Sequence, residues 1–91
     1  MTVHELKCWP VYFQDVLSGR KSFELRKDDR DGGFKVGDSL HLREFNNVTG
    51  TYTGRECYRD VVYIMRGGCA AIPSFDGYII MSLRVSTILE G

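Results

Sequence analysis

The stretch Gly19-Arg20-Lys21-Ser22-Phe23-Glu24-Leu25-Arg26 decides the fold, because a turn glycine is followed there by an alternating run. Strand side chains repeat every two residues, so Phe23 and Leu25 are expected on one face, with Glu24 and Arg26 on the other. Lys21 lies close enough to turn toward the polar face. Residues 22–27 are therefore predicted to form a short strand that gathers two cations and one anion over an apolar floor.

The residues before this stretch predict a strand followed by a short helix. Residues 3–8 alternate, with His4, Leu6 and Cys8 expected on one side. Trp9-Pro10 then changes the register, and proline is tolerated in a first helical turn. Phe13, Val16 and Leu17 then form an apolar stripe at helical spacing. Gly19 is expected to end the helix in the left-handed conformation. The helix is expected over residues 10–18 and must pack on the sheet, because it is too short to persist alone.

The residues after the stretch predict further strands separated by turns. Residues 28–33 are polar and glycine-rich, and residues 34–38 are expected to hold an apolar anchor and a tight turn. Strands are expected at 39–45, at 51–65 as one long strand or two shorter ones with a bend or bulge at Gly54, and at 77–85, where the apolar run favours a central position. Residues 46–50 are typical of a hairpin tip, 66–68 break the strand, and 69–75 are expected to form a loop or one helical turn.

These elements predict an α+β chain that is mainly β. One short N-terminal helix and five or six strands in 91 residues indicate a single domain, 1–91, built as a small β-barrel with the helix packed on it. A closed or half-closed barrel is favoured because it reduces the exposed sheet edges.

Composition and charge exclude several partners. The apolar fraction of 43% and the charged fraction of 26% are those of an ordinary globular protein. The net charge is zero, so neither long duplex DNA nor an anionic membrane is expected to attract the chain, and no apolar run reaches the ~20 residues of a membrane span. Three widely spaced cysteines, Cys8, Cys57 and Cys69, are expected to be reduced thiols in a cytoplasmic protein.

The polar cluster has two interpretations. On pattern alone it is a solvated strand face whose ion pairs contribute little to stability. Its neighbours favour a ligand site instead, because nearby cations can join the cluster around one carboxylate: His4, Lys7 and Arg30 beside Lys21, Glu24 and Arg26. A rigid guanidinium fork, a mobile ammonium and a carboxylate acceptor suit an anionic or hydrogen-bonding ligand.

The spacing of this stretch resembles a known signature. Gly19-x-Lys21-x-x-Glu24-x-Arg26 matches the G-x-K-x-x-E-x-R motif of the ASCH superfamily, named for activating signal cointegrator homology. The flanks are similar to a small bacterial and phage branch of unknown function, in the His4–Lys7 start, the aromatic helix, residues 26–30 and Val36-Gly37-Asp38-x-Leu40-x-Leu42. The resemblance is strong over residues 4–44 and weak from about residue 46.

The resemblance implies a PUA-like β-barrel whose cleft is lined by Lys21, Glu24 and Arg26. By the same resemblance the chain is expected to bind RNA or a nucleotide-like ligand. The alternative is a minimal hydrolase, of the amidohydrolase or nuclease type, acting on a modified nucleoside or RNA. Lysine serves as nucleophile or base when burial lowers its pKa, so Lys21 and Glu24 are the catalytic candidates. A second carboxylate would strengthen that alternative, and Glu56, Asp60 and Asp76 are available outside any matched motif.

Other patterns are less informative. His4 and Cys8 have a metal-ligand spacing only on a helix, and the segment is predicted to be extended, so neither a metal nor a cofactor is expected. Most tyrosines are expected in the core or at the barrel rim. Trp9 is the exception: it lies where the first strand meets the helix, so we expect it near the cleft as a stacking surface.

Overall fold

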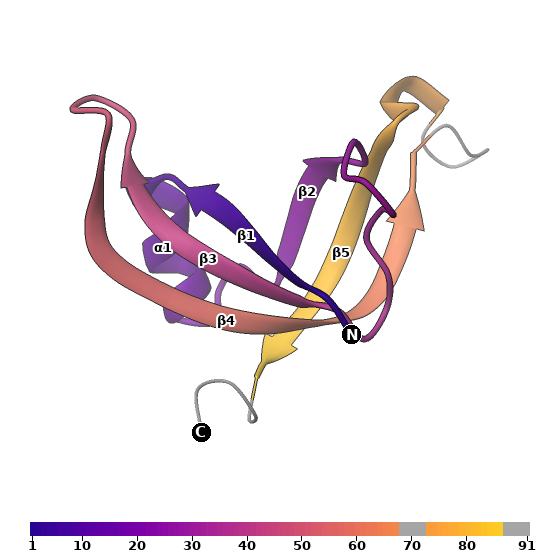
Figure 1. Cartoon of the computed structure of the whole chain (residues 1–91), viewed down its shortest axis with the longest axis horizontal. Coiled ribbons are helices and arrows are strands. Elements are labelled where there is room, and N and C mark those ends of the chain that lie inside the picture. Colours follow the sequence, from indigo (N-terminus) through magenta and orange to yellow (C-terminus); the bar gives the residue numbers. More distant parts are fainter. Residues whose placement is uncertain (68–72, 87–91) are drawn as a thin grey trace.

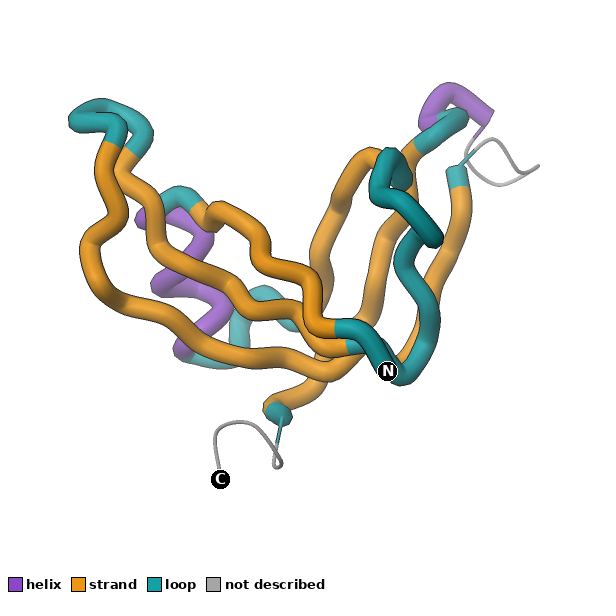
Figure 2. The backbone as a smooth tube through the Cα atoms, in the orientation of Figure 1, coloured by secondary structure: helices purple, strands orange, loops and turns teal. Residues whose placement is uncertain are grey.

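The computed structural model describes residues 1–67 and 73–86, which form a curled five-stranded sheet with one short α-helix (Figures 1 and 2). The chain is therefore mainly β, as predicted. The elements are β1 (Val3–Cys8), α1 (Pro10–Leu17), β2 (Phe23–Lys27), β3 (Ser39–Asn46), β4 (Thr51–Arg66), the 3-10 turn η1 (Pro73–Phe75) and β5 (Tyr78–Val85). Cys69 and the predicted break at Gly68 lie outside the described residues.

The sheet order is β1-β3-β4-β5-β2, so β1 and β2 are its two edges. β1 runs parallel to β3, and the remaining pairs are antiparallel. β4 is long enough to pair with β3 along its first half and with β5 along its second half, and it curves through the whole sheet in Figure 1. The result is a half-barrel, and the predicted central position of the last strand is confirmed because β5 has a neighbour on both sides.

Two irregularities allow β4 to curve. The register shifts between Arg43 and Phe45 of β3, opposite the part of β4 that contains Gly54. Gly54 has a φ of 95°, which L side chains rarely adopt, so the predicted bend at this glycine is confirmed. A second shift lies between Val61 and Tyr63, where β4 passes from one half of the sheet to the other.

The core is a single cluster of buried residues from the strands, the helix and the loop before β3. His4, Leu6 and Cys8 of β1 lie on one face of the strand, as predicted, and this face is buried, while the intervening side chains remain exposed. The buried apolar residues form one cluster that spans all strands but β2 and includes the helix: Leu6, Cys8, Phe13, Val16, Phe34, Leu40, Leu42, Cys57, Val61, Ile79, Met81 and Leu83. Phe34 is the apolar anchor expected in the loop before β3.

Helix α1 packs with Phe13 and Val16 against this core, but Leu17 is 41% exposed. The prediction of Leu17 on the buried stripe is therefore wrong, because within the last turn Val16 is buried and Leu17, the final helical residue, is not. Gly19 has a φ of 83° and its N–H donates to the Val16 carbonyl, which confirms the left-handed closure. The Lys21 N–H then donates to the Asp15 carbonyl, so Lys21 is held beside the helix end.

Asp38 ties the beginning of the chain to the turn before β3. Its carboxylate accepts hydrogen bonds from the Thr2 and Lys35 N–H groups, at 3.1 and 3.0 Å, and lies 2.8 Å from His4 Nε2. Burial raises the pKa of Asp38, but these hydrogen bonds outweigh it and hold the pKa below its ordinary value. His4 is thus a buried partner of Asp38.

No helix among the described residues is long and apolar enough to cross a bilayer.

Candidate functional site

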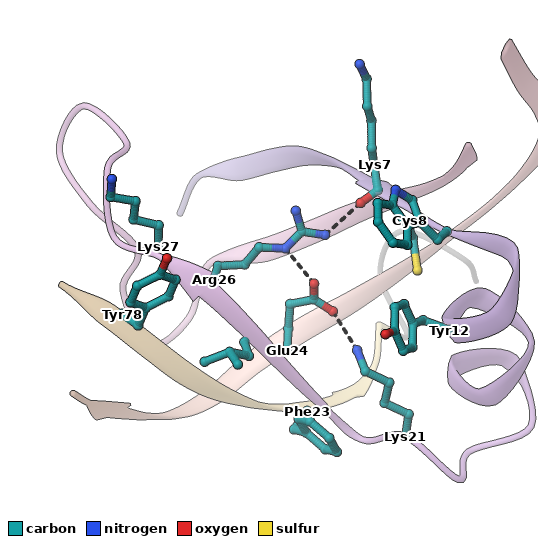
Figure 3. A pocket seen from close by; sticks show the side chains of 11 residues that line it. Lys7, Cys8, Tyr12, Lys21, Phe23, Glu24, Arg26, Lys27 and Tyr78 are labelled. Atoms are coloured by element: carbon teal, nitrogen blue, oxygen red, sulfur yellow. Dashed lines mark hydrogen bonds and ion pairs between the residues drawn. The ribbon is translucent and has the colours of Figure 1, made fainter. Parts of the chain in front are cut away.

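A cavity of about 580 Å³ opens where the end of β1, the start of α1 and the whole of β2 meet (Figure 3). This volume is within the range of about 300–1,000 Å³ that is common for small-molecule sites. It is lined by residues of these segments, by one residue of the α1–β2 turn and by one residue of β5: Lys7, Cys8, Trp9, Tyr12, Lys21, Phe23, Glu24, Leu25, Arg26, Lys27 and Tyr78. We call it the motif pocket, since all three charged motif residues line it.

Glu24 is at the centre of the motif pocket and is only 4% exposed. Lys21 Nζ lies 3.0 Å from one carboxylate oxygen, and Arg26 Nε lies 2.5 Å from the other. Both oxygens therefore accept a charge-assisted hydrogen bond, and Figure 3 shows the two cations approaching from opposite sides. The three side chains form a triad with one net positive charge.

The predicted alternation of β2 is confirmed, but its orientation is the reverse of the expected one. Glu24 is buried, whereas Phe23 and Leu25 are 46% and 44% exposed. Phe23 and Leu25 are therefore half-exposed parts of the pocket lining and not a buried floor beneath the cluster, and the interpretation as a solvated polar face is wrong. The reason is the curl of the sheet, which turns one face of edge strand β2 toward β1 and α1 and encloses the motif carboxylate.

Arg26 also joins the two sheet edges. Its Nη2 donates a hydrogen bond of 2.6 Å to the backbone carbonyl of Lys7 on β1. The Lys7 side chain points away from the cavity in Figure 3, and its ammonium lies 4.4 Å from the centre of the Phe45 ring. Lys7 thus contributes its carbonyl to the arrangement, not the ligand-binding cation that was expected.

Two aromatic rings stand at the helix side of the motif pocket. Trp9 and Tyr12 are 48% and 49% exposed, and their ring centres lie 6.4 Å apart at an angle of 20°. Lys21 Nζ lies 5.7 Å from the centre of the Tyr12 ring. Trp9 lines the pocket as expected. Tyr12 was not singled out, although its position three residues after Trp9 places both rings on one side of a helix.

Cys8 lines the motif pocket but is a poor nucleophile there. Burial, followed by the negative charge of Glu24, raises the pKa of its thiol to about 11, although Lys21 and Arg26 act in the opposite direction. A thiol with this pKa is protonated at neutral pH, and only the thiolate attacks electrophiles.

The remaining predicted site residues lie elsewhere. Arg30 lines a second, smaller cavity and donates to the Glu5 carbonyl, whereas His4 is buried against Asp38 outside the motif pocket. No group of three or more His, Cys, Asp or Glu side chains that would suit a metal ion is found in residues 1–67 and 73–86.

The carboxylates that would complete a hydrolase are not in the motif pocket. Glu56, Asp60 and Asp76 are absent from its lining, and within the described chain Glu24 is the one acidic side chain there. Asp60 accepts a hydrogen bond of 2.8 Å from the Ser39 hydroxyl. The sequence alone could not predict that these residues lie outside the pocket, because they are on β4 and the η1–β5 turn and their distance from β2 depends on the strand order.

Comparison with known proteins adds a family and a phage relative. A stretch of 54 residues is 44% identical to the "Uncharacterized 12.9 kDa protein in GpA 3'region" of Escherichia phage P2. The matched stretch covers 59% of this chain and 46% of the phage protein, so the chain spans about half of that relative. The model of a domain of unknown function, DUF3850, matches residues 3–83 and thus includes every strand start and the whole motif pocket. The chain therefore belongs to the DUF3850 family.

Proposed function

We propose that this protein is a binding module for single-stranded RNA or a nucleotide-like ligand, with the motif pocket as its site. The observation that carries the proposal is the buried Glu24, which fixes Lys21 and Arg26 beside two exposed aromatic rings in one cavity. A nucleotide has both features that such a cavity recognises, an anionic phosphate and a flat base.

The charges favour an anionic ligand. Lys21 and Arg26 carry two positive charges against the single charge of Glu24, and the exposed Lys27 adds a third cation at the rim. The chain has no net charge, so this local excess is the electrostatic feature that distinguishes the pocket. Arg26 uses Nε and Nη2 for Glu24 and Lys7, and a guanidinium has five N–H donors in all, so donors remain for a phosphate.

The aromatic rings favour a base. Trp9 and Tyr12 are about half exposed at the pocket, where a planar ligand can stack on them. Stacking of a base on an aromatic side chain contributes about 1–3 kcal/mol in single-strand binding proteins. It is tolerant of sequence, which suits an accessory or regulatory protein.

The ASCH resemblance supports the same proposal. The G-x-K-x-x-E-x-R residues line one pocket of a mainly β half-barrel, which is compatible with a PUA-like domain that binds RNA. The similarity to a phage protein agrees with the phage branch that the flanking residues resemble.

Binding is favoured over hydrolysis by the single carboxylate of the described pocket lining. Both oxygens of Glu24 are engaged by cations, and Cys8 holds its proton, so neither group is prepared as a base or nucleophile. Release of product from an acylated cytidine or a short RNA, lost in Glu24→Gln, would replace this proposal with the hydrolase alternative.

The fluorescence of Trp9 tests the proposal, because this is the one tryptophan of the chain and it lines the pocket. Uridine monophosphate and short oligouridylates are expected to quench it saturably, and added salt is expected to weaken binding. Lys21→Ala should reduce the affinity about tenfold, the effect of one charge-assisted contact, whereas Lys35→Ala removes an exposed lysine outside the pocket and should not. Equal losses in both variants, or no quenching, would refute the proposal.

A further inference from the structure

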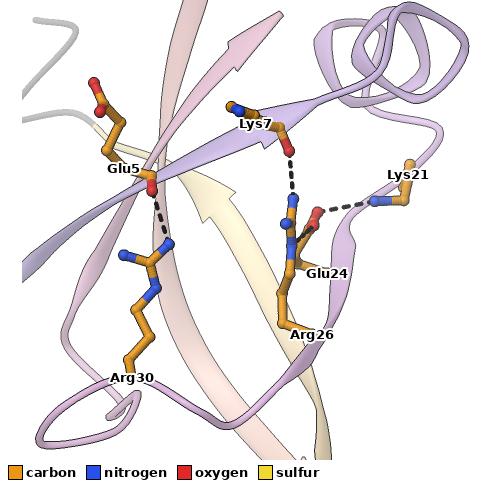
Figure 4. A network of polar contacts seen from close by, with 6 residues as sticks. All are labelled: Glu5, Lys7, Lys21, Glu24, Arg26 and Arg30. Carbon is orange, nitrogen blue, oxygen red and sulfur yellow. Dashed lines mark hydrogen bonds and ion pairs between the residues drawn. The ribbon is translucent and has the colours of Figure 1, made fainter. Parts of the chain in front are cut away.

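Two arginines join the free edges of the half-barrel. Arg26 of β2 donates to the Lys7 carbonyl, and Arg30 of the following loop donates to the Glu5 carbonyl, at 2.6 and 2.9 Å (Figure 4). These carbonyls are two residues apart on β1, so they lie roughly 6.6 Å apart along the strand. We call this line of contact between β1 and the β2 side the seam.

A second cavity, of about 280 Å³, lies on the seam next to the motif pocket. Its lining consists of Leu6, Arg26, Lys27, Asp29, Arg30 and Phe34. Arg26 and Lys27 belong to both cavities. The two cavities are therefore adjacent, with Arg26 and Lys27 as shared parts of their walls.

The second cavity has the charge of a phosphate subsite. Three cations and one carboxylate, Asp29, line it. Asp29 and Arg30 are both exposed, so water screens their interaction with each other. The Arg30 guanidinium lies 5.8 Å from the centre of the Phe34 ring and donates to one carbonyl, which fixes its position while leaving further donors.

We propose that the seam binds a single-stranded oligonucleotide across Arg26, with one nucleotide in the motif pocket and the next phosphodiester on Arg30 and Lys27. The inference rests on the proposed function and extends it from a mononucleotide site to a site for at least two linked nucleotides. The two carbonyls that hold Arg26 and Arg30 lie roughly 6.6 Å apart along β1, about twice the ~3.4 Å rise of a stacked strand, which suits an unstacked, extended chain. Splayed bases are the form in which proteins read single strands.

The test compares ligands that differ by one linked nucleotide, with Trp9 fluorescence as the readout. The wild-type protein is titrated with uridine monophosphate, with the dinucleotide pUpU and with its deoxy counterpart. We expect pUpU to bind about tenfold more tightly than the mononucleotide, as one added charge-assisted phosphate contact predicts. The deoxy dinucleotide shows whether the subsite recognises the phosphate alone or the ribose as well, and equal affinity assigns it to the phosphate.

Arg30→Ala is the variant that isolates the second subsite. It should remove the tenfold gain for pUpU while leaving the affinity for uridine monophosphate unchanged, and Arg30→Lys should retain part of the gain. Lys35→Ala is the matched control, because it removes one exposed cation of the same loop region outside both cavities. Urea unfolding of each variant checks that Arg30→Ala remains folded, and Arg30→Gln replaces it if it does not.

The outcomes separate this inference from the proposed function. If uridine monophosphate binds with dependence on Lys21 but pUpU shows no gain, the second subsite is refuted and the motif pocket stands. If the gain survives Arg30→Ala and Arg30→Gln, the phosphate contact lies elsewhere and the inference is equally refuted. If neither ligand binds, both proposals fall.

Discussion

Replacing Glu24 by glutamine tests the central feature of the motif pocket, the burial of one carboxylate between two cations. The side chain of Glu24 is 6% exposed, and those of Lys21 and Arg26 are 17% and 29% exposed. Breaking a fully buried ion pair costs about 3–5 kcal/mol, because a charge is left uncompensated. Here both cations retain contact with water and the amide retains a hydrogen bond, so we expect a loss of about 2 kcal/mol.

The assay is urea or thermal unfolding, with Glu5→Gln as the matched control. Glu5 also faces two basic side chains, Arg43 at 3.1 Å and His41 at 3.8 Å, but its side chain is 56% exposed. An exposed pair of this kind contributes about 0–1 kcal/mol. For a domain of this size a loss of about 2 kcal/mol lowers the melting temperature by roughly 10 °C.

The double variant Lys21→Gln/Glu24→Gln sharpens the result. Removing one cation relieves the repulsion that Glu24→Gln leaves between Lys21 and Arg26, so the double variant should lose less stability than the sum of the single variants. If Glu24→Gln and Glu5→Gln differ by less than about 0.5 kcal/mol, the triad is no more than a solvated pair and the reasoning is refuted.

Three further predictions follow from burial and backbone geometry. Because burial raises the pKa of Cys8 to about 11, its thiol should be alkylated at pH 8 about 100-fold more slowly than a thiol of pKa 9.0, as mapped by mass spectrometry. The raised pKa also makes the stability of the fold depend on pH: the contribution of Cys8 is present below pH 9 and is lost as the pH rises through 11. Asp38→Asn should lower the free energy of unfolding by about 1–3 kcal/mol at pH 7. This difference in stability from wild type should shrink as the pH falls through the depressed pKa of Asp38, and a difference that persists in acid would contradict the prediction. Gly54→Ala should lower the free energy of unfolding by about 1–2 kcal/mol, because alanine rarely adopts the positive φ of this position. Gly67→Ala should lower it further, because the added methyl group would overlap the Phe75 backbone. Similar unfolding midpoints for the two variants would contradict the turn geometry.

Local sequence was sufficient for most elements. Alternation in residues 3–8 predicted which side chains share a face, and Gly19 and Gly54 marked a helix end and a bend that the structure contains. These features depend on neighbours in the chain, so periodicity and turn residues report them directly.

The orientation of β2 could not be predicted in the same way. A period of two gives the two faces of a strand but not which face is covered, and Phe23 and Leu25 favoured the wrong answer. The curl of the sheet determines which face of β2 is covered, because it brings β1 opposite β2. Hydrogen bonds from Arg26 and Arg30 to β1 carbonyls stabilise this arrangement, and they join residues 19 and 25 positions apart in the sequence. The same long-range geometry directs the Lys7 ammonium outward and buries His4 against Asp38.

The most direct test of the proposed function is an amide NMR titration of the wild-type protein with pUpU. Saturable shifts are predicted at Trp9, Lys21, Glu24 and Arg26, which line the motif pocket, and none at the hairpin tip, residues 46–50. Lys21→Ala should weaken these shifts at equal ligand concentration, whereas Lys35→Ala should not. Unchanged spectra at the four pocket residues, or shifts centred on the hairpin tip, would contradict the assignment of the motif pocket as a nucleotide site.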